Sequence, residues 1–433
     1  MSRRDWIGLC MLLLVFFSLT VIYNAVSPSF EAPDEVGHFY FIVYLLDRGR
    51  LPVVPAAVPP PNYEQEGIQA PLYYLSSALV VRALSGPLGL DLSDASAPIE
   101  INPYSTCGRV QPRYNLDYFE HDVHAERFPY QGRIRVLHVV RLWSSLLATL
   151  TVAGVFAATR LAFPSVPKAS WLAAGVTAFI PEFIFTAAAV NNDNMVTVLA
   201  TWGIVLALYT VRGGISWARV LAMGLIAGLA GLSKLAGSGL ILLSGFVVLI
   251  VVWRDERATH RGVRRMLRGV LAYGVLLTAS YLLVMGWWVW RNWTLYGDLT
   301  GIRPHLALMP VRDETSFWAL IQESPGLFRS WWGTFGCTAP PAGFYLIGAL
   351  VTLAALAGLL AARDGLRDDA VSVAVLLLWL GLMLVAYIRW NWIVCAPKGR
   401  LVYPAMASVG ALIGRGLAYW TAKWRGFGVG TLA

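Results

Sequence analysis

Apolar stretches long enough to cross a membrane recur along the whole chain. A hydrocarbon core of about 30 Å needs about 20 apolar residues per helix. Because unpaired backbone polar groups are too costly in hydrocarbon, each such stretch should be helical. We interpret ten stretches as transmembrane spans: 6–27, 136–159, 169–190, 194–211, 217–233, 236–253, 269–290, 342–362, 371–388 and 401–420. The fifth and sixth are almost continuous and separate at Ser233-Lys234, where we expect a tight turn.

The composition supports a membrane protein and excludes several other classes. Hydrophobic residues make up 57% of the 433 residues, charged residues make up 14%, and the mean hydropathy is +0.59. A soluble chain carries about 25% charged residues. The deficit excludes an ordinary soluble enzyme, a disordered chain and a secreted disulfide scaffold. The net charge of +9 would suggest a nucleic-acid partner in a soluble protein; here we expect no nucleic acid, because topology accounts for the charge.

Lysine and arginine in the short loops set the orientation of the chain. Segment 254–268 alone carries six arginines, and the side of the membrane to which it belongs holds 17 basic and 6 acidic residues. The other side holds 17 basic and 19 acidic residues. We therefore expect both termini in the cytoplasm and the two long connections outside. The N-terminal run resembles a signal peptide, but its length and the lack of a convincing cleavage site favour an uncleaved anchor.

The spans divide the chain into segments with different expected roles. The proline-rich 51–70 is expected to be irregular or polyproline-like, and the polar 86–135 to carry little regular structure. Cys337 and Cys395 both fall outside and either pair or remain free thiols. The segments are a first transmembrane helix (1–27), an outer loop with interfacial helices and an acidic motif (28–135), transmembrane helices 2–7 (136–290), a second outer loop (291–341), transmembrane helices 8–10 (342–420) and a cytoplasmic tail (421–433).

An acidic pair, Asp34-Glu35, follows the first span. The apolar run over 39–46 is too short to cross the membrane, so it should form a helix lying in the outer interface. Asp34 would then stand at the start of that helix, where a carboxylate can cap exposed N–H groups, and His38 would lie one turn later on the same face. Alternatively, Asp34 is only a cap and Glu35 only a solvated charge.

Other polar residues are expected at the same outer face. Each has an ordinary explanation, since Asn and Asp favour turns and interfacial Arg or Lys extend toward headgroups. Together they would surround a pocket suited to a ligand with an anionic head and a hydrocarbon tail. These residues are Asn191, Asn192, Asp193, Asn194, Lys234, Arg291, Asn292, Lys398, Arg400, Tyr403 and Arg141.

Two further features leave alternatives open. Glu182 lies inside the third span, where an acid is either functional or a protonated, hydrogen-bonded helix contact. His121 and His124 have a spacing that can bind metal, but no third ligand is near them in the sequence, so we expect no metal site there.

Seven motifs in order resemble the GT-C-fold membrane glycosyltransferases. The resemblance extends over about residues 5–420 and is strongest to an uncharacterised bacterial group with a Pro-Asp-Glu-x-x-His motif. A departure occurs at Gln69-Ala70-Pro71, where the group commonly has a charged residue or His followed by Pro-Pro. The motifs are Ala32–Phe39, Gln69–Leu75, Arg141–Trp143, Pro181–Phe183 with Asn191–Asp193, Gly228–Lys234, Trp290–Asn292 with Tyr296–Asp298, and Gly399–Arg400 with Tyr403–Pro404.

The resemblance implies an all-α GT-C fold and an inverting transfer of sugar from a polyprenyl-phosphate donor. The acceptor would be a glycan, glycolipid or protein at the outer face of a bacterial cytoplasmic membrane. No metal is required in this prediction, although a divalent metal is possible. The expected roles are Asp34 (base) and Glu35 in catalysis, His38, Asp193 and Asn192 in orienting the acceptor, Lys234, Arg291, Arg400, Tyr403 and Arg141 at the donor phosphate, and Gln69 and Tyr73 in an interfacial helix.

A transporter or flippase for a lipid-linked or anionic substrate is the main alternative. It predicts ionisable residues near the middle of the membrane and access from both sides. A convergence of Asp34, Asp193, Lys234 and Arg291 at one outer cavity would favour the transferase.

Overall fold

The computed structural model describes residues 2–54, 63–105, 117–259, 262–336 and 338–429. Within these ranges the protein is helical and forms no strand. Eight segments are long and apolar enough to cross a membrane. They are α1 (Arg3–Val26), α4 (Gly132–Ala162), α7 (Asp193–Gly213), Leu235–Ala258 with η2 (Leu235–Gly239) and α9 (Leu240–Thr259), α10 (Val263–Tyr296), α13 (Ala342–Ala361), α15 (Ala370–Asn391), and Gly399–Lys423 with η3 (Gly399–Ala405) and α16 (Met406–Val429).

Two of the ten expected spans differ from the prediction. The third is broken into α5 (Pro167–Ala178) and α6 (Pro181–Ala187), which meet at 65°. Pro181 explains the break, because proline lacks an N–H and disfavours helical geometry in the residue before it. The fifth, α8 (Trp217–Gly231), has 15 residues and is therefore about 22 Å long, shorter than a bilayer core. The described chain thus has eight candidate spans, or nine if the bent pair counts as one.

Helix α4 lies at the centre of the bundle and packs against α1, α5, α7 and α16. Small residues permit the closest approaches of α16 to its neighbours. A Cβ atom at Gly416 would lie 2.0 Å from the carbonyl oxygen of Ala355 in α13, and one at Gly414 would lie 2.3 Å from that of Ala169 in α5. Van der Waals packing of small residues drives helix association where no water is available to be released. These two glycines therefore fix the C-terminal helix against both neighbours.

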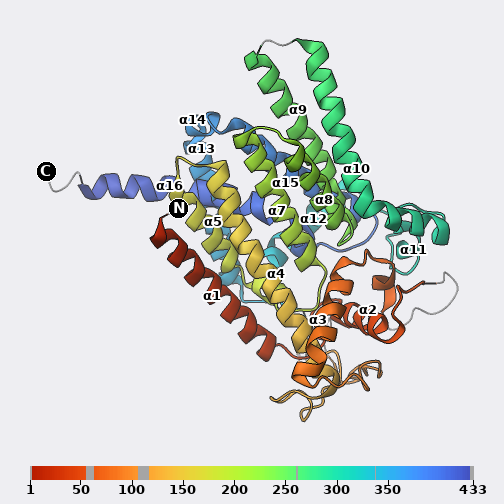
Figure 1. Cartoon of the computed structure of the whole chain (residues 1–433). Coiled ribbons are helices and arrows are strands. Elements are labelled where there is room, and N and C mark those ends of the chain that lie inside the picture. Colours follow the sequence, from red (N-terminus) through yellow and green to blue (C-terminus); the bar gives the residue numbers. More distant parts are fainter. Residues whose placement is uncertain (1, 55–62, 106–116, 260–261, 337, 430–433) are drawn as a thin grey trace.

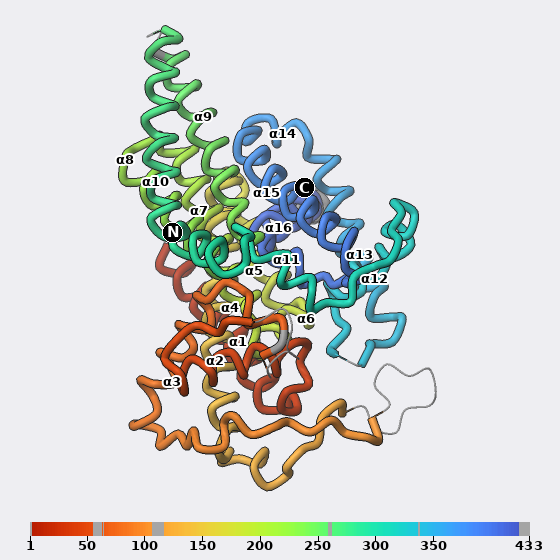
Figure 2. Tube along the Cα trace, turned by 90° about the vertical axis from the view of Figure 1, so that its right-hand side faces the viewer, coloured from red at the N-terminus to blue at the C-terminus, as the bar shows by residue number. Residues whose placement is uncertain are grey.

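The first long connection lies at the end of the molecule opposite the tip of the α9–α10 hairpin (Figure 1), and the start of the second connection contacts it. The first holds α2 (Glu35–Arg48), η1 (Glu64–Ile68) and α3 (Leu72–Leu88). Between α3 and α4 the described residues form one isolated bridge, Ile101 with Phe119. The second holds α11 (Ile302–Leu306) and α12 (Phe317–Trp332) and runs across the molecule from α10 to α13 (Figure 2). The short α14 (Arg363–Arg367) links α13 to α15.

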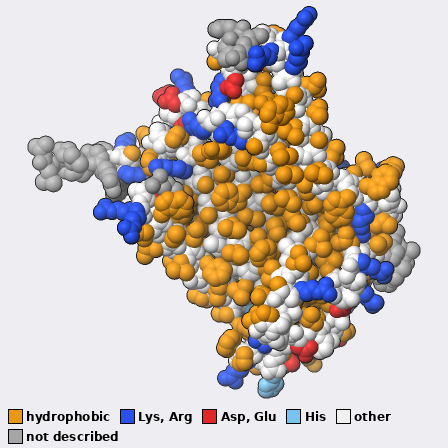
Figure 3. Space-filling view, in the orientation of Figure 1, with side chains coloured by type: hydrophobic (Ala, Val, Ile, Leu, Met, Phe, Trp, Pro, Cys, Tyr) orange, Lys and Arg blue, Asp and Glu red, His pale blue; other side chains and the backbone are white. Residues whose placement is uncertain are grey.

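Hydrophobic side chains cover the middle of the surface, and charged side chains gather toward its ends (Figure 3). Many large apolar residues of the outer helices are exposed, among them Leu271 at 69% and Leu350 at 57%. Such a broad apolar belt is costly in water but is the expected surface of a chain embedded in lipid. The fold is therefore that of a polytopic, all-helical membrane protein, as predicted.

Candidate active site

Asp34 occupies the turn between α1 and α2 in a left-handed conformation, with φ 64° and ψ 5°. This region is uncommon for a residue other than glycine and often marks a functional constraint. The Asp34 side chain makes no capping hydrogen bond to α2, so the prediction that its carboxylate caps this helix is wrong. The carboxylate instead accepts a hydrogen bond from Arg400.

Four charged side chains contact one another in a series of alternating sign, which we call the charged cluster. Arg400 in η3 donates to Asp34, and its Nη1 lies 3.7 Å from Oδ2 of Asp193. Lys234 is the fourth member of the cluster, because its Nζ lies 2.5 Å from Oδ1 of Asp193. Asp193 is buried, with 1% of its side chain exposed, whereas Asp34 and Lys234 expose 42% and 28%. Asp34 and Lys234, at the two ends of the series, are therefore the accessible members of the charged cluster.

Turn chemistry places Asp193 and Lys234 at this position. Asp193 is the first residue of α7, and its N–H donates to Oδ1 of Asn191 (2.8 Å). Asn194 donates to the carbonyl oxygen of Thr186 in α6 (2.9 Å). Lys234 lies in the extended turn between α8 and η2, at the predicted break of the fifth and sixth spans. The asparagine-rich turn is thus a structural feature that also presents an acid.

The predicted interfacial residues Gln69 and Tyr73 frame this cluster. Oε1 of Gln69 accepts a hydrogen bond from Nδ2 of Asn192 (2.5 Å). The Tyr73 hydroxyl lies 2.8 Å from Oγ of Ser144 and accepts from the backbone N–H of Asn191 (3.1 Å). These contacts join the start of α3 to the turn before α7 and hold the residues next to Asp193 in place.

Glu35 and Arg141 form a fully buried pair behind Asp34. Arg141 donates from Nε and Nη2 to both carboxylate oxygens of Glu35 (2.9 and 2.6 Å), and Glu35 also accepts from the N–H of Val190 (2.8 Å). The other three donors of the guanidinium bind backbone oxygens at the end of α1, those of Asn24, Ser27 and Pro28. All five N–H donors of an arginine are then used. This placement favours a structural role for both residues over contact with substrate.

His38 is 2% exposed, and its Nδ1 lies 2.8 Å from the hydroxyl of Tyr74. Burial lowers the pKa of His38 to about 3, with Arg400 and Lys234 also lowering it. The imidazole is therefore neutral at physiological pH, and its contact with Tyr74 joins α2 to α3.

The remaining predicted residues have other partners. Arg291 donates to the carbonyl oxygen of Pro52 (2.6 Å) and lies over the ring of Trp288 at 4.8 Å. The Tyr403 ring, 1% exposed, packs edge-on against Trp331. Arg291 thus binds the first outer connection and is not a member of the charged cluster.

Glu182 is 4% exposed and accepts hydrogen bonds from the backbone N–H groups of Thr334 (2.7 Å) and Phe335 (3.1 Å). These donors follow α12 in the second outer connection. Of the two alternatives that the sequence left open, the contacts favour a hydrogen-bonded structural role, with the acid holding this connection against α6.

His305 in α11 is a buried histidine near the site that sequence reasoning missed. Its ring packs against Trp390, with 5.6 Å between ring centroids. Burial lowers the pKa of His305 to about 4, and the charges of Lys234 and Asp34 lie close enough to influence it. No motif surrounds His305, so only the folded position of the second outer connection reveals it.

The charges also set the protonation of Asp34. The protein that covers part of Asp34 raises the pKa of its carboxyl, but Arg400 and, more weakly, Lys234 more than offset that effect and bring the pKa to about 2. Asp34 is therefore ionised at neutral pH. A change that draws Arg400 away would return the carboxylate toward ordinary basicity.

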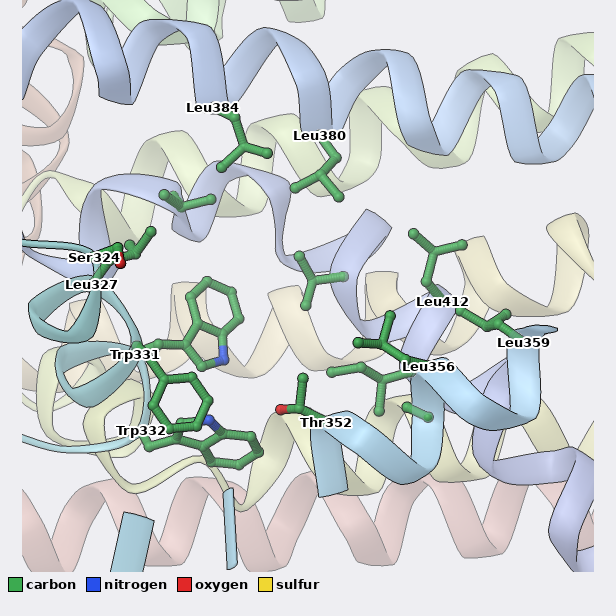
Figure 4. Close-up of a pocket in the computed structure, with 15 residues that line it drawn as sticks. Ser324, Leu327, Trp331, Trp332, Thr352, Leu356, Leu359, Leu380, Leu384 and Leu412 are labelled. Atoms are coloured by element: carbon green, nitrogen blue, oxygen red, sulfur yellow. The ribbon is translucent and has the colours of Figure 1, made fainter. Parts of the chain in front are cut away.

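An apolar groove of about 350 Å³ begins beside η3, the element that carries Arg400. Helices α12, α13, α15 and α16 form its walls. Trp331 and Trp332 lie at one end, and Leu359 and Leu412 lie at the other (Figure 4). Trp331 also packs against Tyr403, with 5.2 Å between ring centroids. The groove could hold a hydrocarbon chain whose polar head faces the charged cluster.

No family model and no curated protein matches the sequence. Two solved structures of oligosaccharyltransferase from Archaeoglobus fulgidus resemble this protein. One is a complex with Zn and sulfate, and the other, of the oligosaccharyltransferase AglB, is a complex with an inhibitory peptide and a dolichol-phosphate. Each match has a TM-score of 0.50 and 13% identity, and covers 96% of this chain and 50% of the other. ArnT from Cupriavidus metallidurans matches with a TM-score of 0.43 and 14% identity, over 97% of this chain and 77% of the other. The chain therefore spans about half the length of the oligosaccharyltransferase and shares its fold, the expected GT-C fold.

Proposed function

We propose that this protein transfers a sugar from a polyprenyl-phosphate donor to an acceptor hydroxyl at the outer face of a bacterial cytoplasmic membrane. The observation that carries the proposal is that the charged cluster Asp34–Arg400–Asp193–Lys234 lies beside an apolar groove. A lipid phosphate needs cations for its head and a dry channel for its tail. The archaeal oligosaccharyltransferase that shares the fold has a structure in complex with a dolichol-phosphate.

Asp34 is the proposed base, because it is the exposed acid of the cluster. The acceptor oxygen forms a bond to the anomeric carbon while the bond from that carbon to the phosphate oxygen breaks. The electron pair of the broken bond leaves with the phosphate, and the hydroxyl proton passes to Asp34. One displacement of this kind inverts the anomeric configuration. The phosphate is a good leaving group, so no second acid is needed, unlike in glycoside hydrolysis.

Arg400 and Lys234 are the proposed partners of the donor phosphate. Nε of Arg400 is buried and has no hydrogen-bond partner among the described residues, and Lys234 is partly open. A phosphate that attracts Arg400 would weaken its bond to Asp34. The pKa of Asp34 would then rise from about 2, so donor binding itself would prepare the base.

The other predicted residues have supporting roles. Asn192 and Asp193 orient the acceptor or hold the cations, and Glu35 and His38 hold the start of α2. A divalent metal is possible in such sites, but here the guanidinium of Arg400 already stands between Asp34 and Asp193. We therefore assign no step to a metal at this cluster. The acceptor is a glycan, glycolipid or protein.

Mass spectrometry of lipid-linked sugars and envelope glycans in a host strain that lacks the gene tests the proposal. We expect one polyprenyl-phosphate sugar to accumulate and one glycan substituent to disappear. Wild-type protein and Asp47→Asn, which changes an exposed acid at the far end of α2, should restore the substituent, whereas Asp34→Asn should not. Restoration by Asp34→Asn would exclude Asp34 as the base, and an unchanged lipid and glycan profile would exclude the transferase.

Lys234→Ala provides a second comparison, with Lys168→Ala as its control. Lys168 is exposed at the start of α5, on the predicted cytoplasmic side. Loss of a charge-assisted bond to phosphate should raise the donor KM about 10- to 100-fold. An equal effect of the two substitutions would exclude the phosphate role of Lys234.

A further inference from the structure

Three metal-binding side chains meet in the outer part of the protein. Glu31 lies between α1 and α2, and Asp117 and His121 come from the irregular segment before α4. One ligand atom of each lies within 4.8 Å of the other two, and all three residues are partly buried. Glu31 and His121 are 90 residues apart in the sequence, so the fold alone brings the group together.

The surroundings of the His121 ring require a cation. Nδ1 lies 2.8 Å from Oε1 of Glu126, and Nε2 lies 3.3 Å from Oε1 of Glu31. An ionised carboxylate only accepts hydrogen bonds, whereas a neutral imidazole has one N–H and one lone pair. One of the two contacts would then set a lone pair against a carboxylate. Either a second proton on the ring or a metal ion at one nitrogen removes this conflict.

The two nitrogens have different environments. Glu126 faces Nδ1 and also lies 3.5 Å from the backbone N–H of Ser29. A metal-binding histidine commonly donates its other N–H to a carboxylate in this way, which fixes the ring and its tautomer. Nε2 is left facing Glu31. Two ligands about 2.1 Å from one tetrahedral ion lie about 3.4 Å apart, close to the 3.3 Å that separates Nε2 from Glu31.

We propose that Glu31, Asp117 and His121 bind one divalent transition-metal ion of the Zn²⁺ class, with Glu126 orienting the imidazole. One nitrogen and two carboxylate ligands suit zinc and its neighbours better than calcium or magnesium, which favour all-oxygen sites. A water molecule can complete the tetrahedron. The site is separate from the charged cluster at Asp34, where the cation next to the acid is Arg400.

The ion would act as a clip for the first outer connection. Between α3 and α4 the described residues form no helix, and Phe119 contacts Glu31 through one hydrogen bond of 2.9 Å. Metal ligation of distant residues closes a long loop and stabilises such a segment. Glu31 is three residues from Asp34, so the clip would also fix the turn that presents the proposed base.

Metal content of the purified full-length protein tests the site directly. After incubation with Zn²⁺ and removal of unbound ion, we expect about one ion per chain by elemental mass spectrometry. Co²⁺ should give the visible absorption of a tetrahedral site. Glu31→Gln and His121→Gln should lose both signals, and Glu126→Gln should weaken binding about 10- to 100-fold. His124→Gln, in the same segment and exposed, should behave as wild type.

Two results would overturn the proposal. One is wild-type protein that holds no more ion than His121→Gln, which would leave the ring as a doubly protonated imidazolium. The other is equal loss in His124→Gln, which would indicate unspecific binding. Size-exclusion chromatography identifies any variant that fails to fold. Glu126→Gln keeps all three ligands and therefore remains informative if the ligand variants do not fold.

Discussion

Arg400 donates a hydrogen bond to Asp34 across 366 positions of the sequence. The bond joins the last membrane segment to the turn after the first one. It also keeps the carboxyl of Asp34 strongly acidic, since Arg400 counters the effect of burial on its pKa. The same guanidinium is the proposed partner of the donor phosphate, so base strength and donor binding are coupled through one side chain.

The first prediction follows from this coupling. Arg400 is the main group that lowers the pKa of Asp34. In Arg400→Met the pKa should therefore rise from about 2 toward or above its ordinary value. Because a base must be ionised, the acidic limb of the kcat/KM profile should move to higher pH. Loss of the cation should also lower kcat about 10²- to 10³-fold.

Arg389→Met is the matched control, because Arg389 is an exposed arginine near the end of α15. It should leave both the acidic limb and kcat at wild-type values. An acidic limb that stays in place in Arg400→Met would show that Asp34 is not the titrating base.

Much of the membrane architecture could be predicted from local properties of the sequence. Span length depends on hydrophobicity over about 20 residues, and eight of the ten runs form continuous helices of sufficient length. The break in the third run had a visible cause in Pro181, but neighbouring helices often tolerate proline within a span. Sequence alone therefore did not decide between a kink and a break.

Partnerships in the site were harder to predict than positions. Asp34, Asp193 and Lys234 were each expected at the outer face because they follow or separate apolar runs. The same reasoning could not distinguish Arg400, which contacts Asp34, from Arg141, whose donors are all used by Glu35 and by backbone oxygens at the end of α1. Both arginines are at span ends, and only the packing of distant segments determines which one contacts Asp34.

The second prediction concerns the buried pair. Glu35→Gln would leave the guanidinium of Arg141 without a counter-ion at a position that is 0% exposed. Removing one member of a buried ion pair typically costs about 3–5 kcal/mol. We expect a clear fall in the unfolding temperature of the detergent-solubilised protein, measured by intrinsic fluorescence.

Asp255→Asn provides the comparison at an exposed pair, in which Arg254 and Asp255 expose 46% and 48% of their side chains. Such pairs contribute about 0–1 kcal/mol, so stability should barely change. Equal stability of Glu35→Gln and wild type would contradict a structural role for the buried pair.

The third prediction tests the apolar groove as the site of the donor tail. Leu384→Trp should fill part of the groove lined by this residue. A long polyprenyl donor should then bind more weakly, whereas a donor with a very short prenyl chain should be unaffected. The ratio of kcat/KM for long and short donors measures the effect. Val385→Trp, at the neighbouring position with 64% of the side chain exposed, should keep the wild-type ratio, and an unchanged ratio in Leu384→Trp would place the tail elsewhere.

The fourth prediction concerns His305 and the pH dependence of stability. Burial lowers the pKa of His305 to about 4 in the folded protein, whereas an unfolded histidine titrates near 6.5. Between these values the unfolded state binds more protons, so stability falls as pH decreases from 6.5 toward 4. At pH 5 this one residue should cost about 1–2 kcal/mol relative to pH 7.

His305→Gln removes the titrating group and should therefore reduce the loss of stability between pH 7 and pH 5. Unfolding temperatures of the variant and wild type at the two pH values measure that difference. His124→Gln changes an exposed histidine of the first outer connection, so it should keep the wild-type response. If His305→Gln lost as much stability on acidification as wild type, the imidazole would not be held neutral against Trp390.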